Sequence, residues 1–259
     1  MGSFVDYEVR DGIGYIHLKR PEVLNALTDD MILELKDMLY AFDDDQDAKV
    51  AILSGSGRAF CSGADVRQRQ LRPREELARL GSAQGRGSHL DELFYRSVNW
   101  KPIIAAVHGY AVGAGLYLAF MCEMIVAAEG TQFQITETSR GVDSTNFWAL
   151  LAHRTNGGFS TDVALTGRFW SAEEGSKWGG VDRLVPAGQH ITAAEELARE
   201  IMSNPPLSVR AMVEARRGTN EEIEMQARLR RPRGLHLTED FHESALAFVE
   251  KRQPVFQGR

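Results

Sequence analysis

The sequence predicts an α/β protein in which parallel strands alternate with helices. Two short apolar runs, at residues 50–53 and 102–107, have the length and composition of buried strands. A Gly-rich turn follows each run, and segments with apolar residues at helical spacing separate them. Strands that alternate with helices in this way are typical of parallel sheets joined by helical crossovers.

The chain is expected to open with a β-hairpin. Residues 5–9 alternate apolar with polar side chains, as in a half-buried strand, and residues 14–18 form the returning strand. Between them, Asp11-Gly12 is a dipeptide favoured in tight turns. Thr28 then stands where an N-cap is expected, before a helix whose apolar residues recur at helical spacing as far as residue 42.

The rest of the chain continues this alternation and then becomes helical. The expected order is a Gly- and Ser-rich loop at 54–64, an Arg-rich, mobile and partly helical segment at 67–90, a helix beginning at Leu90, an apolar helix at 116–121 and a strand at 124–127. From Ala193 onward the pattern is helical, and Pro205-Pro206 separates two of the helices.

Composition excludes several classes of function. The formal net charge of -6 over 259 residues argues against nucleic acid as the main partner, because phosphate binding requires a basic surface. Two cysteines, Cys61 and Cys122, make neither a disulfide framework nor a metal site, which fits a reduced cytoplasmic compartment. No apolar run reaches the ~18 residues of a membrane helix, and residues 1–10 lack the apolar core of a signal peptide.

Two Gly-rich turns, at residues 60–66 and 108–115, are the strongest candidates for a functional site. Each follows a buried strand and precedes a helix, so it leaves free backbone N–H groups where the helix dipole favours negative charge. Brought together, the two turns could hold one developing oxyanion. Ordinary tight strand-to-helix connections would give the same pattern, and neither turn fits a dinucleotide-binding or P-loop motif.

These turns and several flanking motifs resemble the crotonase (enoyl-CoA hydratase/isomerase) superfamily. The flanking motifs are Lys19-Arg20-Pro21 with Asn25-Ala26-Leu27, Leu165-Thr166-Gly167-Arg168, Gly179-Gly180-Val181-Asp182, and the run from Glu239 through Phe248 to Phe256. The resemblance implies a spiral of ββα units at 1–190 that carries an acyl-CoA site, followed by a helical trimerisation region at 191–259. It also implies a homotrimer or a dimer of trimers.

The resemblance implies a chemistry as well. The backbone N–H groups of Ala64 and Ala114 match the family's oxyanion hole, which stabilises the enolate of a CoA thioester. Coenzyme A would be part of the substrate, and no other cofactor or metal is expected. Ala114 replaces the commoner glycine, so the backbone at this position must avoid positive φ.

The family's hydratases use two glutamates, and this chain matches one of them. Glu137 corresponds to the later glutamate, whereas Tyr117 stands where the earlier one is expected. A phenol with a pKa near 10 is a poor general base at neutral pH. The sequence therefore favours one-carboxylate, isomerase-like chemistry over hydration, with hydrolysis or decarboxylation of a CoA thioester as alternatives within the same fold.

Two further groups of side chains leave alternatives open. Asp143, six residues after Glu137, is either a second catalytic carboxylate or an Asx-turn or helix-cap residue. Phe147 and Trp148 either line an acyl pocket or belong to the core. Cys61, His108 and Glu123 are interpreted as structural, and His153 is interpreted in the same way.

The expected contacts to coenzyme A come from three parts of the chain. They are Val23, Leu24 and Ala26 in the opening loop, Ser62, Asp65, Val66 and Arg67 around the first turn, and Phe248 and Lys251 in the last helix. An acyl-CoA-binding protein without turnover is the main alternative, because both Ala114 and Tyr117 depart from the family pattern. RNA binding is a third reading, which the acidic balance disfavours.

Overall fold

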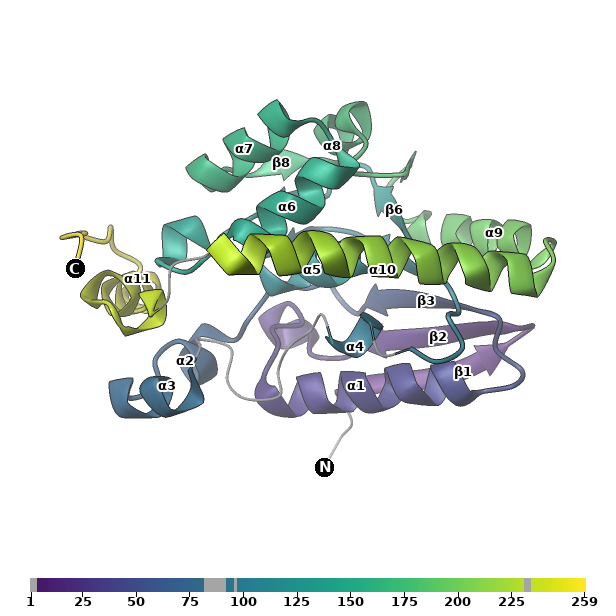
Figure 1. Ribbon diagram of the computed structural model, residues 1–259, viewed down its shortest axis with the longest axis horizontal. Helices are drawn as coiled ribbons and strands as arrows, with labels where there is room; N and C mark the ends of the chain where they lie inside the picture. Colours follow the sequence, from purple (N-terminus) through teal and green to yellow (C-terminus); the bar gives the residue numbers. More distant parts are fainter. Residues whose placement is uncertain (1–3, 82–91, 96, 231–233) are drawn as a thin grey trace.

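The computed structural model describes residues 4–81, 92–95, 97–230 and 234–259. Its centre is a six-stranded sheet, and a three-stranded sheet lies beside it (Figure 1). The larger sheet has the order β1-β2-β3-β4-β6-β9, with bounds Val5–Arg10, Ile13–Leu18, Val50–Gly55, Ile103–Val107, Met124–Ala128 and Arg183–Val185. The smaller sheet has the order β5-β7-β8, with bounds Tyr110–Val112, Gln132–Gln134 and Trp170–Ser171.

Parallel pairing dominates the larger sheet, as the alternation of strands and helices predicts. Only β1 and β2 pair antiparallel there, and they form the expected hairpin. Asp11 and Gly12 have φ of 51° and 80°. Two consecutive positive φ angles match the tightest hairpin turns, whose twist suits that of the flanking strands.

Both faces of the larger sheet are buried, which explains why its strands read as continuous apolar runs. Alternate residues of β3 and β4 belong to two separate core clusters. Ile52 and Ile104 face α9 (His190–Met202), which packs on β3, β4 and β6. Leu53 and Ala105 face the larger cluster, where α1 (Asp29–Asp44) and α5 (Ala114–Met121) lie.

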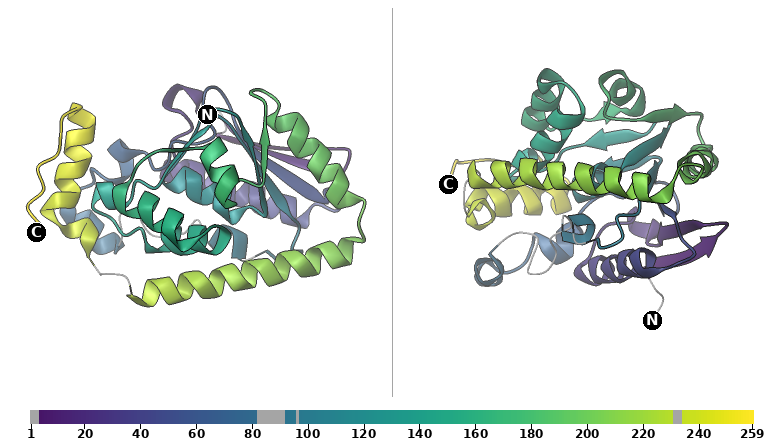
Figure 2. Two further views of the ribbon diagram at one scale, coloured as in Figure 1. Left: turned by 90° about the horizontal axis from the view of Figure 1, so that it is seen from above. Right: turned by 45° about the vertical axis from the view of Figure 1, so that its right-hand side comes forward.

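The remaining helices surround these sheets (Figures 1 and 2). Helix α1 begins where expected, because Thr28 Oγ1 accepts a hydrogen bond from Met31 N at 3.2 Å. The others are α2 (Val66–Arg69), α3 (Arg74–Leu80), α4 (Glu92–Tyr95), α6 (Thr145–Arg154), α7 (Gly157–Thr166), α8 (Ala172–Trp178), α10 (Pro206–Arg230) and α11 (Glu239–Glu250), with short 3-10 helices η1 (Pro21–Val23), η2 (Thr138–Arg140) and η3 (Leu235–Leu237).

Several expected boundaries are corrected. Strand β3 runs on through Gly55, two residues into the expected loop, and α5 begins at Ala114 rather than at residue 116. The second Gly-rich turn contains β5, which pairs in parallel with β7. The helix expected from Leu90 is described from Glu92, and residues 82–91 of the segment expected to be mobile lie outside the described residues.

Helix α10 crosses the outside of the molecule in front of α5 and packs on α6 and α4 (Figure 1). It is fastened by Arg217, whose guanidinium donates to both oxygens of Glu123, at 3.0 and 2.9 Å. Glu123 Oε2 also accepts from Ile103 N at 2.7 Å, at the start of β4. Glu123 is therefore the structural anion that the sequence analysis expects, and it joins α10 to the central sheet.

Two negative findings apply to the described part of the chain. None of its helices combines the length and the apolar content that a bilayer crossing needs. Its His, Cys, Asp and Glu side chains form no cluster of three or more that could hold a metal ion.

Candidate active site

The two Gly-rich turns lie against each other. Cys61 N donates to Tyr110 O and Val112 N donates to Cys61 O, each at 3.0 Å, so the first turn pairs with β5. Gly63 has φ +93°, and a methyl group there would lie 2.6 Å from Val112 O and 3.4 Å from Ala114 N. Only glycine permits this approach, because a side chain would meet the backbone of the second turn.

This contact brings together the two backbone donors that the sequence analysis singles out. Among the described residues, no hydrogen-bond partner is found for the N–H of Ala64 or for the N–H of Ala114. Ala114 is the first residue of α5, so its N–H points out of the helix end that carries partial positive charge. Gly113 takes the positive φ of 49°, which leaves Ala114 in ordinary backbone geometry, as expected.

Glu137 lies beside these donors. It follows β7 and caps η2, and a methyl group on Gly113 would lie 2.7 Å from Thr136 Oγ1 and 3.2 Å from Glu137 Oε1. The other oxygen, Oε2, is shielded from solvent and has no hydrogen-bond partner among the described residues. Burial raises the pKa of Glu137 to about 7, although hydrogen bonds from Thr136 and the charge of Arg140 oppose the shift.

These groups suit proton transfer next to a carbonyl group. Two preorganised N–H donors stabilise an oxygen that gains negative charge as the neighbouring carbon loses a proton. A carboxylate with a pKa near 7 can both take and return a proton at neutral pH. The arrangement therefore fits enolate chemistry on an activated carbonyl compound.

Tyr117 lies one helical turn after Ala114 and is buried. Its hydroxyl donates to Glu224 Oε1 on α10, and the Tyr95 hydroxyl of α4 donates to Glu224 Oε2 at 2.9 Å. Burial, reinforced by the charge of Glu224, raises the pKa of Tyr117 well above its ordinary value, so the phenol is neutral at physiological pH. Sequence reasoning identifies Tyr117 but misses Tyr95 and Glu224, which reach it only through the fold.

The remaining catalytic and acyl-pocket candidates differ in their surroundings. Asp143 Oδ1 accepts a hydrogen bond from Thr145 N at 3.0 Å, and Asp143 Oδ2 accepts one from the Thr145 hydroxyl at 2.9 Å. These contacts match the Asx-turn alternative. A catalytic role for Asp143 stays a prediction. The Phe147 ring lies 5.2 Å from the Tyr117 ring, whereas the Trp148 indole donates to Thr161 Oγ1 at the surface of α7.

The opening loop lies directly against the first turn, as the predicted coenzyme A contacts require. Ser62 N donates to Leu24 O at 2.9 Å, and Ser62 Oγ donates to Val23 O at 3.3 Å. Buried Asn25 holds this loop in place, since its side chain accepts from Arg20 N and donates to three carbonyl oxygens, those of Ser56, Ala59 and Phe60. The side chain of Val23 remains partly exposed.

The charged candidates near this loop lie at the start of α2. Asp65 caps α2, which begins at Val66, and its carboxylate lies 3.4 Å from the Arg20 guanidinium, which also donates to Ala26 O. Arg67, on the first turn of α2, is exposed.

Helix α11 contacts the segment that carries Glu137 through the pair of Phe248 and Arg140. Helix α11 contacts both α2 and η2, and the Arg140 guanidinium lies 4.0 Å from the centre of the Phe248 ring. Lys251 ends α11 in a left-handed conformation with φ 56°. Phe248 is thus close to the Glu137 segment within one chain, whereas the predicted coenzyme A contacts of Phe248 and Lys251 stay predictions.

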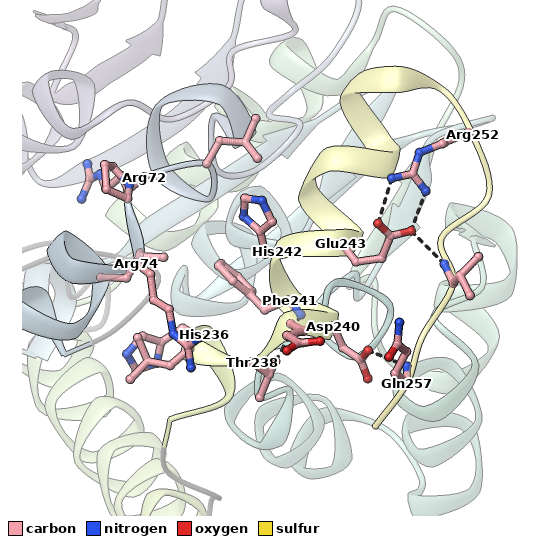
Figure 3. A pocket seen from close by; sticks show the side chains of 16 residues that line it. Arg72, Arg74, His236, Thr238, Asp240, Phe241, His242, Glu243, Arg252 and Gln257 are labelled. Atoms are coloured by element: carbon pink, nitrogen blue, oxygen red, sulfur yellow. Dashed lines mark hydrogen bonds and ion pairs between the residues drawn. The ribbon is translucent and has the colours of Figure 1, made fainter. Parts of the chain in front are cut away.

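A cavity of about 730 Å³ lies between α3 and α11, as Figure 3 shows. Its walls come from residues 71–77 and 236–257, so none of the candidate catalytic residues lines it. In its wall, Arg252 pairs with Glu243 at 2.5 Å, and Glu243 also accepts from Val255 N at 2.9 Å. These contacts hold the end of the chain against α11.

Comparisons with known proteins identify the family of the chain. The sequence pattern of the family described as enoyl-CoA hydratase/isomerase matches residues 8–259. The carnitinyl-CoA dehydratase of Proteus mirabilis is 34% identical over the whole of both chains. The 2,3-dehydroadipyl-CoA hydratase of Escherichia coli is 31% identical over 93% of this chain and 94% of its own.

Solved structures give the same result. A carnitinyl-CoA hydratase from Mycobacterium avium superposes with a TM-score of 0.81 at 26% identity, covering all of both chains. An enoyl-CoA hydratase from Mycobacterium avium subsp. paratuberculosis has a TM-score of 0.80 at 25% identity and covers 98% of each chain. The chain therefore belongs to the enoyl-CoA hydratase/isomerase family of the crotonase superfamily, and it has that family's fold.

Proposed function

We propose that the protein catalyses the reversible hydration of a 2-enoyl-CoA thioester. In this proposal the N–H groups of Ala64 and Ala114 bind the thioester oxygen as it becomes an enolate, and Glu137 transfers the proton at the α-carbon. The observation that carries the proposal is the position of Glu137, whose carboxylate lies against Gly113, directly before the Ala114 donor. Each oxyanion donor of this kind typically contributes ~3–4 kcal/mol to lowering the barrier.

The protonation state of Glu137 decides whether it gives or takes the proton at the α-carbon. Its pKa of about 7 means that both forms are populated at neutral pH. The protonated form can supply the α-proton during hydration, and the ionised form can remove it during dehydration. In this proposal coenzyme A lies near Val23 and Ser62.

Double-bond isomerisation by Glu137 alone is the second candidate. It is favoured by the phenol of Tyr117, which is neutral and already bonded to Glu224, so no second base faces the substrate directly. The sequence-based preference for isomerisation has no support from the similar proteins, which are named as hydratases and dehydratases. Hydration is therefore proposed first.

The test is mass spectrometry of 2-enoyl-CoA, 3-enoyl-CoA and saturated acyl-CoA thioesters after incubation with the protein in heavy water. Hydration adds the mass of one heavy water to a 2-enoyl-CoA, isomerisation converts a 3-enoyl-CoA without that gain, and α-proton exchange labels a saturated thioester. Glu137→Gln is expected to slow all of these by about 10²–10⁴-fold while binding of coenzyme A is kept. Full activity of Glu137→Gln would contradict the assignment, and binding without any labelling by the unaltered protein would support the non-catalytic alternative.

A further inference from the structure

The hydration proposal leaves open which group activates the water, and the structure offers a candidate on α10. Ala114 and Tyr117 lie three residues apart on α5 and therefore share one helix face. Both are 5% exposed, as is Phe147 on α6, whereas Leu116 and Leu118 of the same helix are fully buried at 0%. Ala114 and Tyr117 are thus buried, but slightly less completely than these neighbours on α5.

Glu224, on α10, contacts the hydroxyl of Tyr117. It is 1% exposed, and its carboxylate accepts one phenol on each oxygen, Tyr117 on Oε1 and Tyr95 on Oε2. A phenol has one proton to donate and lone pairs that accept. Because the proton of Tyr117 is directed to Glu224, the free lone pairs of its oxygen can accept a hydrogen bond only from another donor, such as a water molecule.

We propose that Glu224 is a positioning residue that completes the hydration site by acting through Tyr117, in place of a carboxylate on α5. This inference rests on the proposed hydration function. The substrate is the water that adds to the β-carbon of the 2-enoyl-CoA. Tyr117 holds this water, and Glu224 sets the direction of the phenol and takes up the proton that passes along it.

The proton transfers balance in this scheme. A water O–H bond breaks, its proton moves to the Tyr117 oxygen, and the original phenol proton moves to Glu224 Oε1. The water oxygen forms the bond to the β-carbon, and the electron pair of the double bond moves to the thioester oxygen held by Ala64 and Ala114. Glu137 then gives its proton to the α-carbon, and solvent returns the proton from Glu224 to Glu137.

The surroundings of Glu224 favour this role. Burial raises the pKa of Glu224, and the two phenolic hydrogen bonds oppose the shift. A carboxylate with a raised pKa accepts a proton more readily than one in water. The titratable and charged groups around the carboxylate are Tyr95 from α4, Tyr117 from α5, and Glu221 and Arg228 from α10 itself, while Arg216 acts on Tyr95.

A purely structural role for the same contacts makes different predictions. If Glu224 only fastens α10 to α5, its loss lowers the stability of the fold and slows every reaction of the site in parallel. If it acts through Tyr117, its loss slows the addition of water and spares the exchange of the α-proton, which needs Glu137 and the two N–H donors alone.

The experiment compares Glu224→Gln and Tyr117→Phe in two reactions, hydration of a 2-enoyl-CoA and α-proton exchange of a saturated acyl-CoA in heavy water. Both variants are expected to lower kcat for hydration by about 10²-fold or more while exchange continues. The acidic limb of the pH profile of hydration should also change in Glu224→Gln. Glu222→Gln is the matched control, because it neutralises an exposed carboxylate of α10 two residues before Glu224 and leaves both phenols on Glu224 in place.

Each outcome decides the inference. A loss of hydration with exchange retained in Glu224→Gln, and hydration retained in Glu222→Gln, supports it. Wild-type hydration in Glu224→Gln, or an equal loss of hydration and exchange, overturns the role of Glu224 while hydration by the unaltered protein stands. Exchange without hydration by the unaltered protein overturns the hydration proposal together with this role. If Glu224→Gln does not fold, Tyr117→Phe, which keeps the ring, provides the same comparison.

Discussion

Glu137 combines two properties that rarely occur together in a carboxyl group of a folded protein. One oxygen is shielded from solvent and has no hydrogen-bond partner in the described part of the chain, and the group nevertheless lies at the edge of the site proposed to exchange protons. Burial without a partner favours the neutral acid, which raises the pKa to about 7. The same shift has a thermodynamic cost that can be measured without any substrate.

The pKa of Glu137 predicts how stability depends on pH. Because its pKa rises from the ordinary 4.5 to about 7 on folding, the unfolded chain ionises first, and stability is lost as pH rises between these values. Glu137→Gln removes this dependence, so the variant should gain roughly 3 kcal/mol on the wild type between pH 4.5 and pH 8. Urea unfolding at a series of pH values measures the difference, and parallel curves for the two proteins would contradict the assigned pKa.

Which single residues could be identified from the sequence depends on how far away their partners lie. Thr28 could be recognised as an N-cap because it bonds to Met31, three residues later. Glu224 could not, since Tyr117 is 107 positions away and the neighbouring Glu221 and Glu222 give this part of α10 the pattern of a solvated helix face. The sequence identifies Tyr117 only because it departs from the pattern of the family, and its contact with Glu224 is visible only in the folded structure.

At the level of elements, the site is formed where two turns and a short 3-10 helix meet. Because Gly63 has no side chain, the first turn lies against Val112. Because Gly113 has none, Thr136 and Glu137 approach the start of α5. In both places a missing side chain sets the spacing between a donor and its neighbours. The geometry of the proposed oxyanion site therefore depends on glycines that carry no chemistry of their own.

Gly113→Ala tests this dependence against Gly130→Ala. Both glycines have positive φ, so both variants carry backbone strain, typically ~1–3 kcal/mol for a residue in a sparsely populated region, and Gly113, with ψ -125°, also lies outside the left-handed helical region. A methyl at Gly113 meets Thr136 Oγ1 at 2.7 Å, whereas a methyl at Gly130 has nothing within 4 Å. Gly113→Ala should therefore lower kcat/KM by about 10²-fold or more through displacement of the Ala114 donor or Glu137, and Gly130→Ala should lower only the melting temperature.

Equal activity in the two variants would show that the contact at Gly113 does not control the site. A loss in both that follows their stability would have the same meaning. kcat/KM of the two variants is compared at a temperature well below both melting transitions, so that both proteins are folded and a difference in activity reports on the geometry of the site.

Elements differed in how well the sequence predicted them. Strands β3 and β4 could be predicted because both of their faces are buried and every residue is apolar or small. Strand β5 was missed, since it has three residues inside a Gly-rich turn and exists through its pairing with β7. The meeting of the two turns was expected from the resemblance alone, because no local pattern states that Gly63 lies against Val112.

For the whole molecule, α10 is the element that joins distant parts. Arg217 of α10 donates to Glu123, which lies next to the larger sheet. Glu224 of the same helix accepts from Tyr117 and Tyr95 near the candidate site. A division of the chain near residue 190 stays a prediction, and α9, which begins there, shares its core with the larger sheet. Assembly as a trimer or a dimer of trimers also stays a prediction, and Leu207, Met212 and Leu229 leave apolar surface exposed on α10.

Removing the anchor of α10 should destabilise the whole molecule. In Glu123→Ala the guanidinium of Arg217, which is 2% exposed, loses its carboxylate in a buried place. Breaking one partner of a buried ion pair typically costs ~3–5 kcal/mol. Glu200→Ala is the control, because its pair with Arg183 is exposed, and such a surface pair contributes ~0–1 kcal/mol.

Thermal or urea unfolding of the two variants provides the measurement. A similar small effect of both substitutions would mean that α10 is held by its apolar contacts and that the ion pair is dispensable.

The contact between Tyr117 and Glu224 also has a consequence for the order of events during synthesis. The ribosome adds 107 residues after Tyr117, and Glu224 is the last of them. At ~5–20 residues per second, about 5 to 20 seconds pass before Glu224 exists. Once Val185 has been added, the growing chain contains every strand of the two sheets, Glu137 and the N–H groups of Ala64 and Ala114, whereas the carboxylate that accepts from Tyr117 has not yet been made.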